Sequence, residues 1–99
     1  MTDKEKIKQF DDCKEFLKRF VGNTAICYVG KRNNALSMRT VFARYKFVDY
    51  GAIGFELKTN DDETLFIPAR YLDTASLRDT SVRIIYNTDD IVGITILAK

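Results

Sequence analysis

Over the first 21 residues, apolar side chains recur at every third or fourth position. That spacing places them on one face of a helix. Thr2 and Glu5 have the spacing of a capping box, and Gly22 suits the left-handed conformation that ends many helices. The pattern therefore predicts a helix over residues 3–21. Its apolar stripe consists of Ile7, Phe10, Cys13, Leu17 and Phe20, widened by Phe16 and Val21.

From residue 24 onward the pattern changes to short alternating runs separated by polar turns, which indicates β-strands. Within the longest run, residues 35–50, the apolar positions change from even to odd numbers near Thr40. A strand of period two cannot change in this way without a bulge or a sharp bend. Strands are predicted at residues 24–29, 35–50, 53–58, 64–67, 81–86 and 91–97, and residues 69–77 are predicted to form a short helical turn before another strand.

This order of elements predicts a mostly β fold with an N-terminal α-helix. A chain of 99 residues is the length of one domain, here residues 1–99. Short strands joined by tight turns favour a small antiparallel barrel of about five to six strands over residues 24–98. A long strand that bends midway is typical of SH3-like barrels.

The composition, 45% hydrophobic and 30% charged, is that of a folded globular protein. No apolar run has the length that a bilayer requires, and the charged N-terminus lacks the apolar segment of a signal peptide. We therefore expect a cytoplasmic protein without a membrane partner. Cys13 and Cys27 are interpreted as small buried hydrophobic residues, with a disulfide between them as the alternative.

This sequence contains few of the residues and motifs on which catalysis usually depends. It contains no histidine, which removes the commonest general base and the commonest metal ligand. No glycine-rich phosphate-binding motif is present, and the carboxylates of residues 61–63 and 89–90 lie in predicted turns. We expect no catalytic residue, no metal site and no cofactor.

Positive charge is concentrated in one segment. Residues 30–50 carry a balance of +4, whereas residues 51–99 carry −3. If Tyr45 and its odd-numbered neighbours face the core, Phe42 shares the outer face with basic side chains and offers a surface for a nucleic-acid base. The alternative is an ordinary wet strand face, where charges protect an edge from mispairing. The predicted nucleic-acid-binding residues are Lys31, Arg32, Arg39, Phe42, Arg44 and Lys46.

Two stretches resemble the Sm-like family, and in particular its bacterial RNA-chaperone branch. FLKRFVGNTAICYVGKRNNAL, residues 16–36, resembles the end of that family's helix, its first strand and its turn. KFVDYGAIGFELKTNDDETLFIPARYLDTASL, residues 46–77, resembles its acidic turn and later strands. The resemblance implies an Sm-type barrel, RNA as a partner and assembly of several copies. Phe66-Ile67-Pro68 stands where the bacterial branch carries Tyr-Lys-His, so no binding residue is carried over from that motif.

These observations lead to two hypotheses of different classes. The first is a non-catalytic protein of Sm-like type that binds nucleic acid, with single-stranded RNA as the partner. The second is a protein–protein interaction module, such as an adaptor, inhibitor or assembly subunit, that uses a strand edge or the helix stripe. A third reading, an enzyme subunit that completes another protein's active site, has no residue of its own to support it.

Overall fold

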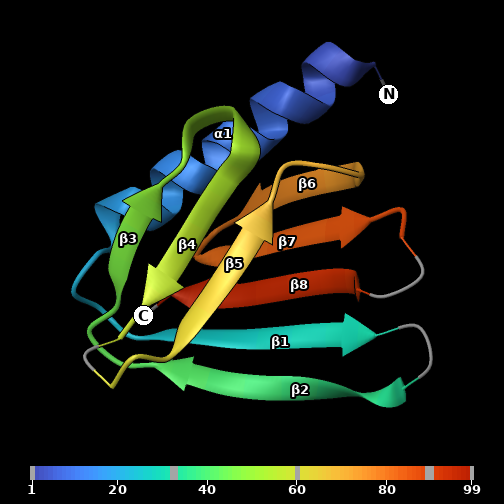
Figure 1. Cartoon of the computed structure of the whole chain (residues 1–99). Coiled ribbons are helices and arrows are strands. Elements are labelled where there is room, and N and C mark those ends of the chain that lie inside the picture. Colours follow the sequence, from blue (N-terminus) through green and yellow to red (C-terminus); the bar gives the residue numbers. More distant parts are fainter. Residues whose placement is uncertain (1, 32–33, 60, 89–90, 99) are drawn as a thin grey trace.

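The computed structural model describes residues 2–31, 34–59, 61–88 and 91–98. Within these residues, one helix is followed by eight strands and one turn of 3-10 helix, η1 (Figure 1). The fold is thus mostly β with an N-terminal helix, as predicted. The elements are α1 (Asp3–Arg19), β1 (Ala25–Lys31), β2 (Asn34–Phe42), β3 (Lys46–Asp49), η1 (Gly51–Ile53), β4 (Gly54–Lys58), β5 (Thr64–Pro68), β6 (Leu72–Arg78), β7 (Ser81–Tyr86) and β8 (Ile91–Ala98).

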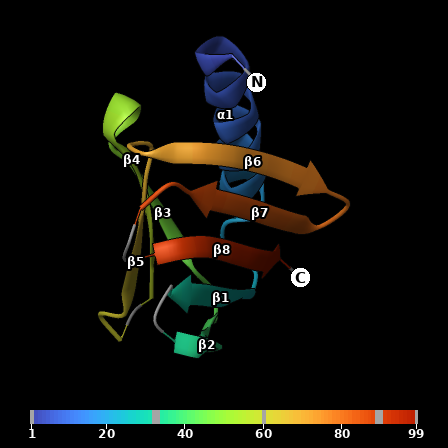
Figure 2. The same cartoon turned by 90° about the vertical axis from the view of Figure 1, so that its right-hand side faces the viewer.

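The strands form two antiparallel sheets. The larger has the order β2-β1-β8-β7-β6, and the smaller has the order β3-β4-β5. The smaller sheet crosses one face of the larger at a steep angle, as Figures 1 and 2 show. In the part of the chain that the structure describes, neither sheet closes on itself. The predicted small antiparallel barrel of five to six strands is therefore not seen as a closed barrel, and the described residues form eight strands in two antiparallel sheets.

The helix begins as the sequence predicts. The Thr2 side chain accepts a hydrogen bond of 3.2 Å from the Glu5 N–H and caps the first turn. The helix ends at Arg19, two residues before the predicted end, and Gly22 has φ +95°. Its stripe is narrower than predicted, because Ile7 and Val21 are exposed. Its buried residues are Phe10, Cys13, Lys14, Phe16 and Leu17.

The predicted run 35–50 consists of two strands in two different sheets, because a turn at Ala43–Arg44 separates β2 from β3. Arg44 adopts the left-handed conformation, with φ 52°. This turn changes which positions face inward, so that Phe42 and Tyr45 are both buried. The predicted change of register exists, but it lies at residues 43–44 and not near Thr40.

The predicted helical turn at residues 69–77 is wrong, because residues 72–78 form β6 and residues 69–71 form an irregular turn. The Asn87 N–H donates to the Tyr71 carbonyl oxygen at 2.8 Å and holds this turn against the end of β7.

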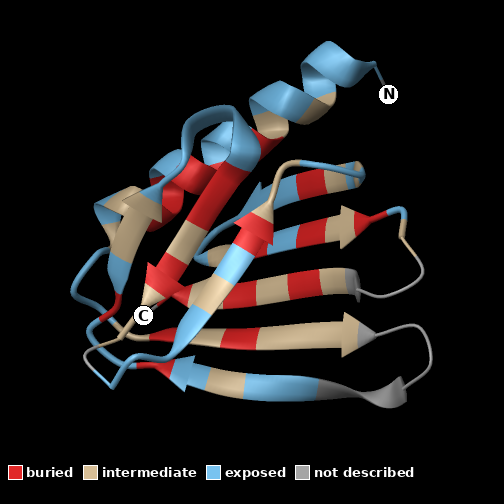
Figure 3. Ribbon diagram, in the orientation of Figure 1, coloured by how far each residue is buried: buried red, intermediate tan, exposed pale blue. Residues whose placement is uncertain are grey.

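The core lies between the two sheets and the helix. Phe55 of β4 is fully buried in it, with the Phe10 ring 5.4 Å away and the Phe47 ring stacked on it at 5.1 Å. Figure 3 shows the alternation of buried and less buried residues along the strands of the larger sheet. That alternation gives the sheet one face toward the core and one away from it. The core side of this sheet includes Ala25, Cys27, Phe42, Ala75, Val82, Ile84, Tyr86, Ile94, Ile96 and Ala98.

Cys13 and Cys27 are free and fully buried. Burial raises the pKa of the Cys13 thiol to about 11, with a smaller contribution from the charge of Asp12, and burial raises the pKa of the Cys27 thiol to about 12. The interpretation as buried apolar residues is confirmed, and the alternative of a disulfide is wrong. Among the described residues, no helix has the length and apolarity needed to cross a membrane.

Candidate nucleic-acid interface

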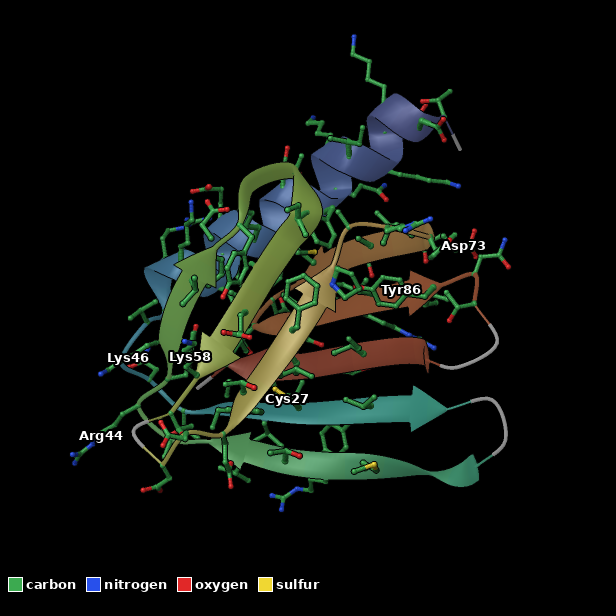
Figure 4. The ribbon with its side chains drawn as sticks, in the orientation of Figure 1. Cys27, Arg44, Lys46, Lys58, Asp73 and Tyr86 are labelled. Atoms are coloured by element: carbon green, nitrogen blue, oxygen red, sulfur yellow. The ribbon has the colours of Figure 1, made fainter. Side chains whose placement is uncertain are left out.

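The basic residues predicted from the sequence lie on two different sheets. Arg39 belongs to β2, whereas Arg44 lies in the turn before β3 and Lys46 begins that strand. Figure 4 shows Arg44 and Lys46 extending away from the body of the molecule at one end of the smaller sheet. The Lys31 side chain and the whole of Arg32 lie outside the described residues. The predicted patch is thus not one surface.

Phe42 is not available for a ligand. Its side chain is 2% exposed and faces the core together with Cys27 of the neighbouring strand. The prediction that this ring stacks on a base is therefore wrong. The cause is the turn at residues 43–44. The alternation of residues 41–47 predicts that only odd-numbered side chains face the core, but before this turn the even-numbered Phe42 faces the core instead.

Lys46 and Lys58 are direct cross-strand partners on β3 and β4. Two like charges in this position repel each other. The Lys58 ammonium lies 3.6 Å from a carboxylate oxygen of Glu56, which also accepts a hydrogen bond of 3.4 Å from the Tyr50 hydroxyl. This carboxylate offsets part of the charge at the Arg44 end of the sheet.

A second basic surface lies on the larger sheet, on the face directed away from the core. We call it the arginine face. Because side chains alternate between faces along a strand, its members follow from the buried residues beside them. They are Val41 and Arg39 (β2), Ile26, Tyr28 and Gly30 (β1), Leu97, Thr95 and Gly93 (β8), Ser81, Arg83 and Ile85 (β7), and Thr74, Ser76 and Arg78 (β6).

One cross-strand row of this face crosses all five strands. Arg39 lies opposite Tyr28, which lies opposite Thr95, and Thr95 lies opposite Arg83, which lies opposite Ser76. With strands about 4.8 Å apart, the two arginines are about 14 Å apart along the row. Tyr28 is half-buried between them, whereas both arginines are exposed.

The regularly paired members of the arginine face carry charge of one sign. They include Arg39, Arg78 and Arg83 and, among the described residues, no carboxylate, whereas Asp73 lies at the irregularity between Leu72 and Thr74 of β6. Nor do these three guanidinium groups form an ion pair with any carboxylate that the structure describes. An ordinary wet sheet face usually interleaves both signs. Unpaired arginines around an aromatic ring are the side chains that contact phosphates and stack on bases.

The face is hollowed at one end. A depression of about 560 Å³ lies over β6, β7 and β8. Its lining residues are Ser76, Leu77, Arg78, Ser81, Arg83 and Thr95. Five of these six described residues carry a hydroxyl or a guanidinium group.

A different hollow of about 360 Å³ opens between the two sheets, beside the start of β5. Val29, Met38 and Leu65 contribute apolar side chains to it, and Glu63 is its only charged lining residue among those described. This hollow has no cationic group for a phosphate. The described lining of this hollow therefore adds nothing to the basic surface on the opposite face of the larger sheet.

Sequence reasoning missed Tyr28, Arg78 and Arg83. The alternation of SVRIIY, residues 81–86, places Arg83 between two core positions and so marks it as outward-facing. Nothing in the sequence shows that β8 lies between β1 and β7, and this order is what brings Arg83 near Tyr28.

Comparisons of the chain with models of known protein families, with curated proteins and with solved structures found no match in any of the three.

Proposed function

We propose that this protein binds single-stranded nucleic acid, with RNA as the natural partner, on the arginine face and without catalysing a reaction. The observation that carries the proposal is the row in which Tyr28 lies between Arg39 and, beyond Thr95, Arg83. The guanidinium groups would neutralise phosphates while the tyrosine ring stacks on a base. Stacking of this kind contributes about 1–3 kcal/mol per base.

A sheet is a suitable platform for an unpaired strand. Its face is broad and its side chains stand at regular intervals, so several nucleotides can lie across neighbouring β-strands. Unpaired bases are free to stack, whereas bases inside a duplex are not. This argument favours a single strand over a double helix.

The sequence resemblance to the Sm-like family supports RNA as the partner and raises a further hypothesis, assembly of several copies. Light scattering coupled to size-exclusion chromatography of nuclease-treated protein measures the solution mass directly. A ring of copies would support the Sm-like hypothesis. A monomer would separate RNA binding from that family's mode of assembly.

Fluorescence anisotropy with a labelled single-stranded RNA, repeated over a range of salt concentrations, tests the proposal. Affinity should fall as salt rises, because phosphate contacts release counterions. Arg39→Gln should weaken binding and reduce the slope of log affinity against log salt by about 0.7, the contribution of one single-strand phosphate contact. Lys8→Gln removes one charge from an exposed position on the helix and serves as the matched control.

The role of the aromatic ring has its own variants. Tyr28→Leu retains an apolar side chain but loses the stacking surface, so its affinity should fall about tenfold or more. Tyr28→Phe retains the ring and should bind like the wild type. A protein that binds no oligonucleotide at low salt, and that purifies with the absorbance ratio of pure protein, would overturn the proposal and favour a protein-interaction module.

A further inference from the structure

The depression at the β6 end of the arginine face contains more anion-binding groups than a backbone phosphate needs. Ser81 and Arg83 lie on the same side of β7, where their cross-strand partners on β6 are Arg78 and Ser76. Thr95 of β8 lies on the other side of Arg83. Two guanidinium groups and three hydroxyl groups from three adjacent strands therefore line one hollow of about 560 Å³.

This set of groups fits a phosphate that carries two negative charges. A phosphodiester within a strand has one charge, whereas a terminal phosphomonoester has close to two near neutral pH. Guanidinium groups bind phosphate oxygens in a bidentate manner, and hydroxyl groups donate to the oxygens that remain. No carboxylate lines the hollow among the described residues.

The position of the hollow also favours the end of a strand. β6 is the edge of the larger sheet, and α1 lies beside it (Figure 2). A second hollow between this edge and the helix has Asp12, Glu15, Gln9 and Arg19 on its helix side. Its two carboxylates outnumber its single guanidinium, so it would repel the next phosphate of a strand that continued past β6.

We propose that the hollow formed by Ser76, Arg78, Ser81, Arg83 and Thr95 binds the terminal phosphate of the nucleic-acid strand whose bases lie over Tyr28. This inference rests on the proposed function and adds to it a preference for phosphorylated ends. The shared ligand chemistry is a phosphomonoester, and either the 5′ or the 3′ end can supply it.

The test compares three forms of one labelled single-stranded RNA in a phosphate-free buffer: one with a 5′-phosphate, one with a 3′-phosphate and one with hydroxyl groups at both ends. One phosphorylated form should bind about tenfold or more tightly than the hydroxyl form, as expected for charge-assisted hydrogen bonds. The form that gains affinity identifies the end. Equal affinities for all three forms would overturn the terminal-phosphate site while RNA binding stands.

Two variants of equal charge distinguish the contribution of the hollow to binding from that of the rest of the arginine face. Arg78→Gln should reduce the preference for the phosphorylated end to about one, because Arg78 lines the hollow. Arg39→Gln lies at the opposite end of the row, so it should weaken all three RNAs alike and retain the preference. A preference that survives Arg78→Gln would contradict the assignment, provided that circular dichroism shows a folded variant.

A measurement without RNA keeps the two proposals distinguishable. Titration with a nucleoside monophosphate should shift the amide NMR signals of residues 76–83. If these signals shift but no RNA binds, the phosphate site stands and the proposed function fails. If they do not shift, the phosphate site is overturned.

Discussion

The Tyr45 hydroxyl donates a hydrogen bond of 2.6 Å to the Leu17 carbonyl oxygen, across 28 positions of the sequence. Leu17 lies near the end of α1, where carbonyl groups lose their usual partners. The Val21 N–H, which would bond Leu17 in a continuing helix, donates to Lys18 instead. One buried hydroxyl thus provides a hydrogen-bond donor for the Leu17 carbonyl at the end of the helix, and connects the helix to the turn that separates the two sheets.

Removing that hydroxyl should destabilise the protein. Tyr45→Phe retains the ring but leaves the Leu17 carbonyl without its donor, at a cost of about 1–3 kcal/mol in the free energy of unfolding. Urea denaturation measures the change. Tyr71→Phe, at an exposed position, is the control and should have the stability of the wild type. Equal stability of the Tyr45 variant would show that the hydrogen bond contributes nothing.

Acid should weaken the contact between α1 and β3. The Lys14 and Lys18 ammonium groups lie 2.7 and 2.8 Å from the two oxygens of the Asp49 carboxylate. Hydrogen bonds from these lysines, and from the Gly51 backbone, hold the pKa of Asp49 well below its ordinary value. A lowered pKa in the folded state contributes stability that is fully present above the unfolded pKa, about 3.9, and is lost as the pH falls through the folded pKa.

Asp49→Asn measures this contribution. Above about pH 4 the wild type should be more stable than the variant, and the difference should decrease as the pH is lowered further. Urea denaturation at a series of pH values provides the comparison. The free energy of unfolding of the variant should therefore depend less on pH than that of the wild type. If the difference between the two proteins stays constant as the pH falls, this carboxylate does not have the proposed role.

The two thiols should be unreactive in the folded protein. With a pKa raised to about 11 for Cys13 and about 12 for Cys27, thiolate is scarce near pH 8, and both side chains are fully buried. Ellman's reagent should label the folded protein roughly a hundredfold more slowly than the protein in concentrated guanidinium. Unfolded protein kept without reductant should release two equivalents of dye per chain, whereas a disulfide would release none.

The parts of the fold that sequence reasoning predicted are those encoded by local patterns. The helix follows from its apolar spacing and its Thr2 cap, and most strand positions follow from alternation between turn residues. The pairing of β1 with β8 joins residues 25–31 to residues 91–98, and no local pattern specifies such a distant pairing. The division of the strands into two open sheets was not predicted for this reason, because it depends on which strands are neighbours.

The candidate site was predicted less well for two physical reasons. Arg44 adopts a left-handed conformation that favours glycine, so the sequence does not mark the turn that buries Phe42. Arg78 and Arg83 lie in a segment whose overall charge is negative, which hides them from a count of charge along the chain. Folding places them on the face that carries Arg39.

Two double variants of equal charge test which of the two basic surfaces binds RNA. Arg39→Gln with Arg83→Gln removes two cations from the arginine face, and should weaken RNA binding and lower the slope of its salt dependence by about 1.4. Arg44→Gln with Lys46→Gln removes two cations from the smaller sheet, where Glu56 already offsets part of the charge, and should leave that slope nearly unchanged. Both sites are exposed, so both variants should fold, and anisotropy titrations over a range of salt concentrations compare them. If only the Arg44 and Lys46 variant lowers the slope, the RNA phosphates contact the smaller sheet at the start of β3 and not the arginine face.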